Sequence, residues 1–268
     1  METFDANKAI TRIASFIAEQ LEASGLSGYV IGLSGGIDSA LSATIAVRAV
    51  GPDKLLALMM PYGANSGESL KDAMGVAEWL CIQSHTVNIS TAIDTYYAQV
   101  GDESQIRRGN KMARERMSIL FDFAHRMNRL VLGTGNRTEI CLGYTTLYGD
   151  AACSINPIGG LYKTEVRLLA GVLGIPEAII NKPPSADLWR DQTDEGEIGV
   201  SYDVIDRLLR RIVDEGVTSM AELTRDGTGE ESVRRVVSLM NANAFKRNLP
   251  PVASLDKPPI PNKVSLQE

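Results

Sequence analysis

The spacing of apolar residues changes repeatedly along the chain, and each change predicts a switch between helix and strand. Residues 10–21 carry apolar side chains at helical spacing, as expected of an amphipathic helix. Residues 29–33 form a continuous apolar run that predicts a buried strand. The same criteria predict further strands over 55–60, 84–89 and 130–132, and helices over 40–50, 70–80, 91–100, 110–128 and 162–173.

Apolar strands that alternate with helices are typical of an α/β fold. We expect a doubly wound, mostly parallel sheet with helices on both faces, Rossmann-like in type, followed by C-terminal helices. A chain of 268 residues suffices for one such domain. Within residues 1–268 we expect a core over 8–180, a mobile lid over about 181–202, helices over 203–243 and an extended, proline-rich tail over 249–268.

A glycine-rich turn follows the first predicted strand and precedes a predicted helix. Adjacent glycines let the backbone turn sharply and bring its N–H groups close to a ligand. The N-terminus of the helix favours an anion such as a phosphate, and serine hydroxyls add hydrogen-bond donors. The turn is therefore expected to bind the phosphates of a nucleotide through Ser34, Gly35, Gly36, Ile37, Asp38 and Ser39.

Asp38 is the acidic residue of this turn, and a carboxylate beside a polyphosphate is repelled unless a cation lies between them. A divalent cation such as Mg²⁺, bound by oxygen ligands and phosphates, is therefore implied. The turn lacks the Lys-Ser/Thr pair that ends a Walker motif. Short Ser-Gly-Gly strings also occur in flexible loops; the strand before this one and the helix after it favour a nucleotide site.

A second glycine turn, over residues 133–136, follows the predicted strand at 130–132. The carboxyl ends of parallel strands meet at one edge of a sheet, so we expect side chains after this strand to lie near Asp38. Glu139 is then a candidate for a second metal-binding carboxylate. Alternatively, Thr138 and Glu139 serve only as caps at the start of a helix.

Two further charged residues have unusual surroundings. Asp150 is a lone acid in a stretch rich in Gly, Tyr and Thr, and is either a turn former or a functional group. Lys163 opens a helix, where the helix dipole disfavours a cation, and a nearby phosphate would explain its position. A solvent-facing lysine is the alternative.

Composition narrows the classes of function. A net charge of −6, from 27 Lys plus Arg and 33 Asp plus Glu, provides no general basic field for nucleic acid. Only His85 and His125 are present, which argues against a serine or cysteine triad. Activation of a carboxylate as an acyl-adenylate fits better, because it depends mainly on positioning and on electrostatic stabilisation of phosphate charge.

The sequence also contains information on the compartment in which the protein is expected to work. Cys81, Cys141 and Cys153 form neither a C-x-x-C pair nor an even set, and we expect buried free thiols in a reducing cytoplasm. The N-terminus lacks the pattern of a signal peptide. No stretch approaches the ~20 apolar residues of a membrane span. These observations favour a cytoplasmic location.

Several motifs together resemble those of the ammonia-dependent NAD synthetases, whose phosphate-binding turn is that of the ATP pyrophosphatases. Their order and spacing match over about residues 8–251. The resemblance implies the α/β fold described above, of the ATP pyrophosphatase type. It rests on residues 32–39, 110–117, 132–139, 148–150, 157–159 with Lys163, 184–189 and 192–195.

This resemblance implies a ligase that forms a C–N bond in two steps. The nicotinate carboxylate of deamido-NAD attacks the α-phosphate of ATP and expels pyrophosphate, and ammonia then converts the adenylate to the amide and releases AMP. The resemblance also implies that Asp38 and Glu139 bind Mg²⁺ and that Asp150 and Lys163 act in catalysis, Asp150 by deprotonating ammonium. It further implies ATP contacts from Gly32, Leu33, residues 34–39, Thr134, Lys163 and Ser185, and deamido-NAD contacts from Arg114 and Lys246.

A homodimer that holds the dinucleotide across the subunit boundary is likewise implied. The chain departs from many family members at Leu147, Ser154 and Phe245, three positions that face deamido-NAD in the family pattern. Nicotinate mononucleotide, or another carboxylate, therefore stays open as the acceptor. The length leaves no room for the amidase domain of glutamine-dependent relatives, so free ammonia is the expected nitrogen source, with a separate glutaminase as the alternative.

Two rival functions keep the nucleotide-binding turn. A tRNA-modifying ATP pyrophosphatase would be expected to carry a basic surface and often paired cysteines, neither of which the sequence provides. A non-catalytic nucleotide-binding module would need neither the two carboxylates, Asp38 and Glu139, nor a lid. Both rivals are therefore less favoured than amide formation.

Overall fold

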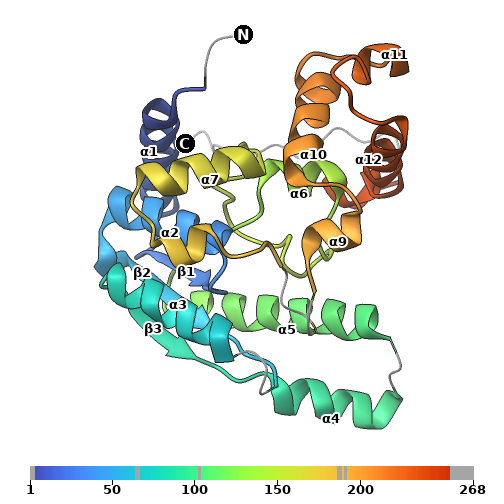
Figure 1. Ribbon diagram of the computed structural model, residues 1–268. Coiled ribbons are helices and arrows are strands. Elements are labelled where there is room, and N and C mark those ends of the chain that lie inside the picture. The colour runs from blue at the N-terminus through green and yellow to red at the C-terminus, as the bar shows by residue number, and fades with distance from the viewer. Residues whose placement is uncertain (1–3, 64–66, 102–103, 186–188, 190–191, 254–268) are drawn as a thin grey trace.

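The computed structural model describes residues 4–63, 67–101, 104–185, 189 and 192–253 (Figure 1). The predicted tail over 254–268 and residues 186–188 and 190–191 of the predicted lid lie outside the described residues. Within the described ranges, no helix combines the length and the apolar character needed to cross a membrane.

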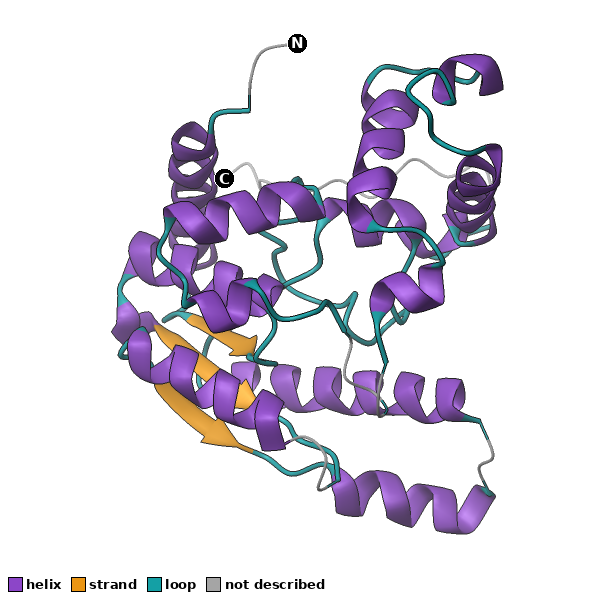
Figure 2. Cartoon of the chain, viewed as in Figure 1, coloured by secondary structure: helices purple, strands orange, loops and turns teal. Residues whose placement is uncertain are grey.

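A parallel sheet lies at one side of the fold and has the strand order β3–β2–β1–β4 (Figure 2). Ile31 of β1 pairs with Ala57 on one side and with Leu132 on the other. Each predicted strand is present, and the predicted α/β fold with a parallel sheet is confirmed. The strands are β1 (Tyr29–Gly32), β2 (Leu55–Met59), β3 (Gln83–Thr86) and β4 (Leu130–Leu132).

The strand β3 differs from the expectation of a buried, apolar strand. All its residues are exposed, and it ends at Thr86 rather than at Ile89. In the described part of the chain β3 pairs with β2 alone, so its outer edge is open to solvent. Polar side chains suit such an edge because they do not invite pairing with another chain.

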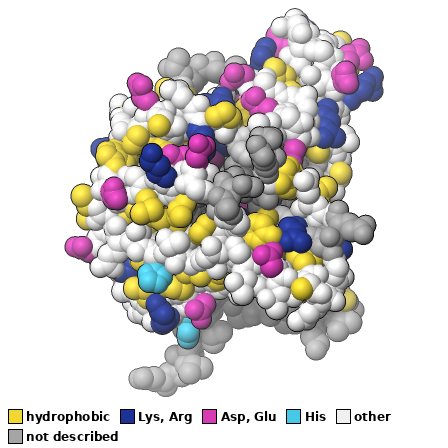
Figure 3. Space-filling view, turned by 60° about the horizontal axis from the view of Figure 1, so that its bottom comes forward, with side chains coloured by type: hydrophobic (Ala, Val, Ile, Leu, Met, Phe, Trp, Pro, Cys, Tyr) yellow, Lys and Arg dark blue, Asp and Glu magenta, His cyan; other side chains and the backbone are white. Residues whose placement is uncertain are grey.

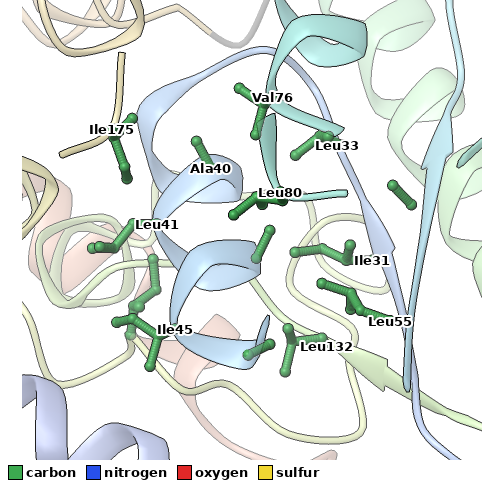
Figure 4. Packing of buried hydrophobic residues seen from close by; sticks show 14 of the residues in the cluster. Ile31, Leu33, Ala40, Leu41, Ile45, Leu55, Val76, Leu80, Leu132 and Ile175 are labelled. Atoms are coloured by element: carbon green, nitrogen blue, oxygen red, sulfur yellow. The ribbon is translucent and has the colours of Figure 1, made fainter. Parts of the chain in front are cut away.

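Helices cover both faces of the sheet, as predicted. On one face, Ile31 belongs to the same buried apolar cluster as Leu41 and Ile45, which project from the side of α2 away from the strands (Figure 4). On the other face, Val30 and Leu58 are buried with residues of α4 and α5. Burying one such Leu or Ile side chain contributes roughly 1.5–3 kcal/mol. These helices are α1 (Ala6–Ser24), α2 (Ile37–Val50), α3 (Gly67–Trp79), α4 (Ser90–Val100), α5 (Gln105–Arg126) and α7 (Lys163–Val172), with a 3₁₀ turn at Pro52–Lys54.

A second group of helices follows the sheet and has its own apolar cluster. Ile205 and Leu209 of α10 pack there with Val236 of α12, so the two predicted C-terminal amphipathic helices are present. The short helix α9 lies inside the predicted lid and was not predicted, because its few residues show no periodicity. The group comprises α6 (Arg137–Leu142), α9 (Asp194–Ile198), α10 (Tyr202–Leu209), a π turn (Arg210–Asp214), α11 (Met220–Leu223), α12 (Glu230–Ala242) and a 3₁₀ turn (Ala244–Arg247). The short helix α8 (Glu177–Ile180) packs instead with α2 and α7, where its Ile179 is buried.

The cysteines correct another expectation. All three are free, but Cys81 is exposed, and Cys141 and Cys153 are only partly buried. Cys81 lies in the turn between α3 and β3 with a φ of +53°, so its side chain leaves the core although Leu80 and Ile82 on either side are buried. Apolar neighbours in the sequence therefore did not indicate the direction of this side chain.

Candidate active site

The carboxyl ends of β1 and β4 bring the two glycine turns together, as predicted. The first turn leads into α2 and the second into α6. Asn136 Nδ2 donates a 2.9 Å hydrogen bond to Oδ1 of Asp38, so the two turns are in direct contact. Asn136 and Glu139 also form a reciprocal capping box at the start of α6. Glu139 therefore caps a helix and also lies beside Asp38. Its role as a helix cap is thus compatible with its being a candidate metal-binding carboxylate.

The first turn is held in shape by its own serine hydroxyls. Ser39 Oγ accepts from the Ser34 N–H at 3.2 Å and donates to the Gly36 carbonyl at 3.0 Å. Gly35 has a φ of +80°, and a Cβ at this position would lie 2.4 Å from the carbonyl oxygen of Ser69 on α3. Only glycine fits there. No side chain caps α2 at Gly36, so the N-terminal N–H groups of α2 are available to an anion.

Lys163 lies between the two predicted metal-binding carboxylates and is 2% exposed. Its Nζ is 2.5 Å from Asp38 Oδ2 and 3.8 Å from Glu139 Oε1. Burial alone would disfavour the ammonium ion, but the charges of Asp38 and Glu139 outweigh it and raise the pKa of Lys163. The alternative of a solvent-facing lysine is wrong, because the side chain turns into the site.

Negative charge is in excess around Lys163. Burial, followed by the charge of Asp38, raises the pKa of Glu139 to about 8. Asp194 of α9 is also close, and burial raises the pKa of this carboxyl group too. Its oxygens accept hydrogen bonds from the hydroxyls of Tyr202 and Tyr144. One ammonium ion therefore faces three carboxyl groups, an arrangement that favours an additional cation.

The donor set suits magnesium. Asp38 and Glu139 supply the hard oxygen ligands that Mg²⁺ prefers. Among the described residues, no group of three or more His, Cys, Asp or Glu side chains is arranged to hold a metal ion. Two carboxylates match an ion that completes its shell with water and substrate phosphates rather than with a protein cage.

A cavity of about 900 Å³ opens over these residues. Of the residues predicted to bind a substrate or a metal, all but Gly35 and Arg114 line this cavity, including Thr134 and Ser185. Gly35 packs on α3 behind the turn. Arg114 is exposed on α5, outside the cavity lining, where its Nε donates to the Leu147 carbonyl at 3.2 Å.

Asp150 and Lys246 lie on another part of the cavity wall. Asp150 Oδ1 accepts from the Thr146 N–H at 2.8 Å, and the surrounding protein raises the pKa of Asp150 through desolvation. Lys246 Nζ donates to the carbonyls of Gly143 and Thr145 at 2.8 and 2.9 Å. Burial lowers the pKa of Lys246, and the charge of Asp150 opposes this. Lys246 therefore anchors the loop that carries Asp150.

The three departures from the family pattern lie outside the lining of the cavity. Ser154 Oγ accepts from the Val131 N–H at 3.0 Å, and Phe245 is 60% exposed. Leu147 contributes its carbonyl to the Arg114 contact. These side chains are therefore not positioned to contact a ligand held within this cavity.

Sequence reasoning missed several residues of the site. Asn136 lies in the second glycine turn, and its position in that turn was the one feature of the sequence that could have indicated a role in the site. Asp194 belongs to the 192–195 motif, but its contact with Tyr202 depends on the tertiary fold. Lys182 lines the cavity and pairs with Asp72 of α3 at 2.7 Å and with Ser69 at 3.1 Å. Nothing in the sequence around residue 182 indicates a partner 110 positions away.

Comparison with known proteins agrees with this geometry. A family model described as NAD synthase matches residues 9–250. The chain belongs to the NAD synthase family. A protein of Fusobacterium nucleatum named NH(3)-dependent NAD(+) synthetase is 45% identical over 245 residues, covering 91% of this chain and 95% of that protein. The family predicted from the sequence is therefore confirmed.

Solved structures of the NAD synthase family have the same fold. The NMN synthetase of Francisella tularensis has a TM-score of 0.84 at 33% identity, covering 94% of this chain and all of that one. The NH3-dependent NAD synthetase of Campylobacter jejuni, solved with a nitrate ion, has a TM-score of 0.80 at 33% identity and the same coverage. One of these two neighbours is therefore named for the synthesis of NMN and the other for the synthesis of NAD.

Proposed function

We propose that this protein is an ammonia-dependent ligase that uses ATP to convert the carboxylate of deamido-NAD to the amide of NAD. In the first step, a nicotinate carboxylate oxygen bonds to the α-phosphorus, and the bond from that phosphorus to the bridging oxygen of the β-phosphate breaks. Pyrophosphate leaves. In the second step, ammonia attacks the carbonyl carbon of the adenylate, and AMP leaves as the new C–N bond forms.

One observation carries this proposal. Asp38, Glu139 and Lys163 come from three separate elements and meet at the carboxyl edge of the sheet, beside an uncapped helix N-terminus. Lys163 brings a cation, and the turn brings backbone N–H groups, to the place where polyphosphate charge must be neutralised. Such an arrangement serves phosphate-bond cleavage without a histidine nucleophile or base.

Roles for the individual residues follow from their placement. Residues 32–39 and Thr134 are proposed to hold the triphosphate of ATP, together with Ser185 from the start of the lid. Lys163 is proposed to exchange its contact with Asp38 for a phosphate oxygen during adenylation. Asp150, whose pKa is raised by desolvation, is proposed to take a proton from ammonium so that neutral ammonia can attack.

Magnesium is proposed as the cofactor, held by Asp38 and Glu139 with phosphate and water oxygens. When bound, it would neutralise charge on the phosphates during their cleavage. The support is the cluster of carboxyl groups around Lys163, where burial and the charge of Asp38 raise the pKa of Glu139. The lid over residues 181–202 and a cytoplasmic location stay predictions of the sequence.

The acceptor has a second candidate. Nicotinate mononucleotide carries the same carboxylate, and the structural neighbour named NMN synthetase has the same fold as this chain. The chain also carries Leu147, Ser154 and Phe245 where many synthetases differ. The match to the NAD synthase family and to relatives named NH(3)-dependent NAD(+) synthetase makes deamido-NAD the favoured acceptor.

A homodimer is proposed as the working form. Arg114 is predicted to bind deamido-NAD but lies outside the lining of this subunit's cavity, as expected if a second subunit completes the site. Large apolar side chains on α4 and α5, among them Tyr96, Ile106 and Phe121, are exposed. Figure 3, with the lower part of Figure 1 turned forward, shows hydrophobic side chains between charged ones of both signs. Sedimentation of the purified protein should give twice the monomer mass.

The experiment that tests the proposal supplies purified protein with ATP, Mg²⁺ and ammonium, and with deamido-NAD or nicotinate mononucleotide in parallel. We expect NAD and AMP to appear in equal amounts, with turnover on the mononucleotide much slower. Faster amidation of the mononucleotide would reassign the acceptor. AMP formation without an amide would contradict ligase activity, and the absence of both products would reject the adenylation chemistry.

A further inference from the structure

The N-terminus of α7, where Lys163 lies, is held by a carboxylate from another helix. Asp206 of α10 is fully buried. Its Oδ2 accepts from the Thr164 N–H at 2.8 Å, and its Oδ1 accepts from Thr138 Oγ1 at 2.5 Å. The Lys163 N–H in turn donates to Thr138 Oγ1 at 2.9 Å. Asp206 therefore satisfies two N–H groups at the start of α7, one directly and one through a hydroxyl that it orients.

These contacts connect α6 and α7, the two helices that supply Glu139 and Lys163. Thr138 precedes Glu139 on α6, and Thr164 follows Lys163 on α7. A hydroxyl donates one hydrogen, so Thr138 Oγ1 must donate to the carboxylate and accept from Lys163 N. The direction of the chain of hydrogen bonds is thereby fixed. Figure 1 shows α6, α7 and α10 adjacent at this point, in agreement with their contacts.

We propose that Asp206 is a positioning residue for ATP binding and adenylation. It lies outside the lining of the cavity and acts through Thr138 and Thr164. By locking the start of α6 to the start of α7, it sets the separation of Glu139 and Lys163. The part of this proposal that concerns adenylation rests on the function proposed above. The part that concerns ATP binding can be tested by binding measurements alone.

The carboxylate is required because both of its contacts are donors. In an Asp206→Asn variant, an amide oxygen facing Thr164 N leaves the amide NH₂ facing Thr138, whose own hydrogen then has no acceptor. The reverse orientation sets two donors against each other at Thr164. Arg210 still contacts Thr164 Oγ1 and Glu165, so α7 keeps a second support and the variant should fold.

The first test measures kcat and KM for each substrate in Asp206→Asn, with the dissociation constant of MgATP determined by calorimetry. We expect kcat/KM for ATP to fall about tenfold to a hundredfold and MgATP to bind more weakly, since the buried contacts are lost. KM for ammonium should change less than twofold. A uniform loss across all substrates, or no loss of ATP affinity, would overturn the proposal.

Thr138 offers a matched pair of variants. Thr138→Val keeps the shape but removes the hydroxyl, and it should reproduce the loss seen in Asp206→Asn. Thr138→Ser keeps the hydroxyl and should restore ATP affinity to near the wild-type value. Combining Thr138→Val with Asp206→Asn should cost much less than the product of the two separate losses, because one chain of bonds is broken in both. Fully multiplicative losses would contradict the proposed link.

A control separates positioning from stability. Leu223→Ala on α11 opens a void in the C-terminal apolar cluster and should lower the melting temperature, while leaving the MgATP dissociation constant and kcat within twofold. If Leu223→Ala impaired ATP binding as much as Asp206→Asn does at equal thermal stability, Asp206 would have only a structural role. Because MgATP binding is read directly, this result stands even if the wild-type protein amidates neither acceptor.

Discussion

Replacing Lys163 by methionine removes the cation between Asp38 and Glu139 while keeping a side chain of similar length. At an effective dielectric of about 20, contacts at the observed 2.5 and 3.8 Å correspond to roughly 7 and 4 kcal/mol before desolvation. Desolvation of the buried ions offsets much of this. Breaking a buried ion pair by deleting one partner costs about 3–5 kcal/mol. We expect the free energy of unfolding of Lys163→Met to fall by about that amount at pH 9.

The loss should depend on pH in a defined direction. Burial and Asp38 raise the pKa of Glu139, whereas Lys163 opposes this, so removing Lys163 raises that pKa further. At pH 7 the folded state keeps this proton in both proteins, because the pKa of Glu139 is already about 8 with Lys163 present. As pH rises to 9, Glu139 of the wild-type protein ionises in the folded state and this group no longer lowers stability further, whereas the folded variant keeps the proton and its stability continues to fall. The deficit of Lys163→Met should therefore be smaller at pH 7 than at pH 9.

Urea unfolding of the ligand-free protein at pH 7 and pH 9 provides the assay. The exposed Lys71 on α3 is the matched control, and Lys71→Met should change the free energy of unfolding by less than about 0.5 kcal/mol. A deficit for Lys163→Met below about 1 kcal/mol at pH 9, or one that is equal at pH 7 and pH 9, would refute this account of the three charges.

Other measurements address the same site. MgATP binding at pH 7 should release a proton from Glu139, whose pKa is about 8. Calorimetry in buffers of different protonation enthalpy should show a smaller proton release for Glu139→Gln, and equal release in both proteins would reject the assignment of Glu139. Asp38→Asn should nearly abolish turnover through loss of a metal ligand, whereas Asp122→Asn on the surface of α5 should not; substantial activity in Asp38→Asn would reject the metal assignment. Asp150→Asn should lower kcat at least tenfold and remove the loss of activity on the acid side of the pH profile, with MgATP affinity unchanged; a weaker affinity would place Asp150 at the nucleotide instead.

The sequence predicted those parts of the fold that depend on local pattern. Apolar runs located β1, β2 and β4, whereas β3 consists of polar residues and its end was misplaced. Helical spacing located α1 to α5, α7, α10 and α12. The position of Asp38 near Glu139 was also predictable, because both follow strands whose ends share one edge of a parallel sheet.

What could not be predicted depends on partners far away in the chain. The burial of Lys163 is determined by Asp38, 125 positions earlier, and not by the helix that Lys163 opens. The role of Asp206 depends on Thr138, 68 positions away, and no local pattern distinguishes it from a solvated acid on an amphipathic helix. The short helix α9 and the outward turn at Cys81 were missed because a few residues carry too little periodicity.

The long separation between Asp38 and Lys163 couples nucleotide binding to completion of the whole domain. A fragment that ends before α7 contains the glycine turns but not the lysine that balances their charge. A ligand that binds only the complete arrangement stabilises the folded state by about 2.7 kcal/mol at a hundred times its dissociation constant. The folded fraction of a destabilised variant should therefore follow the supply of ATP, so that the substrate also acts as a folding aid for the chain that consumes it.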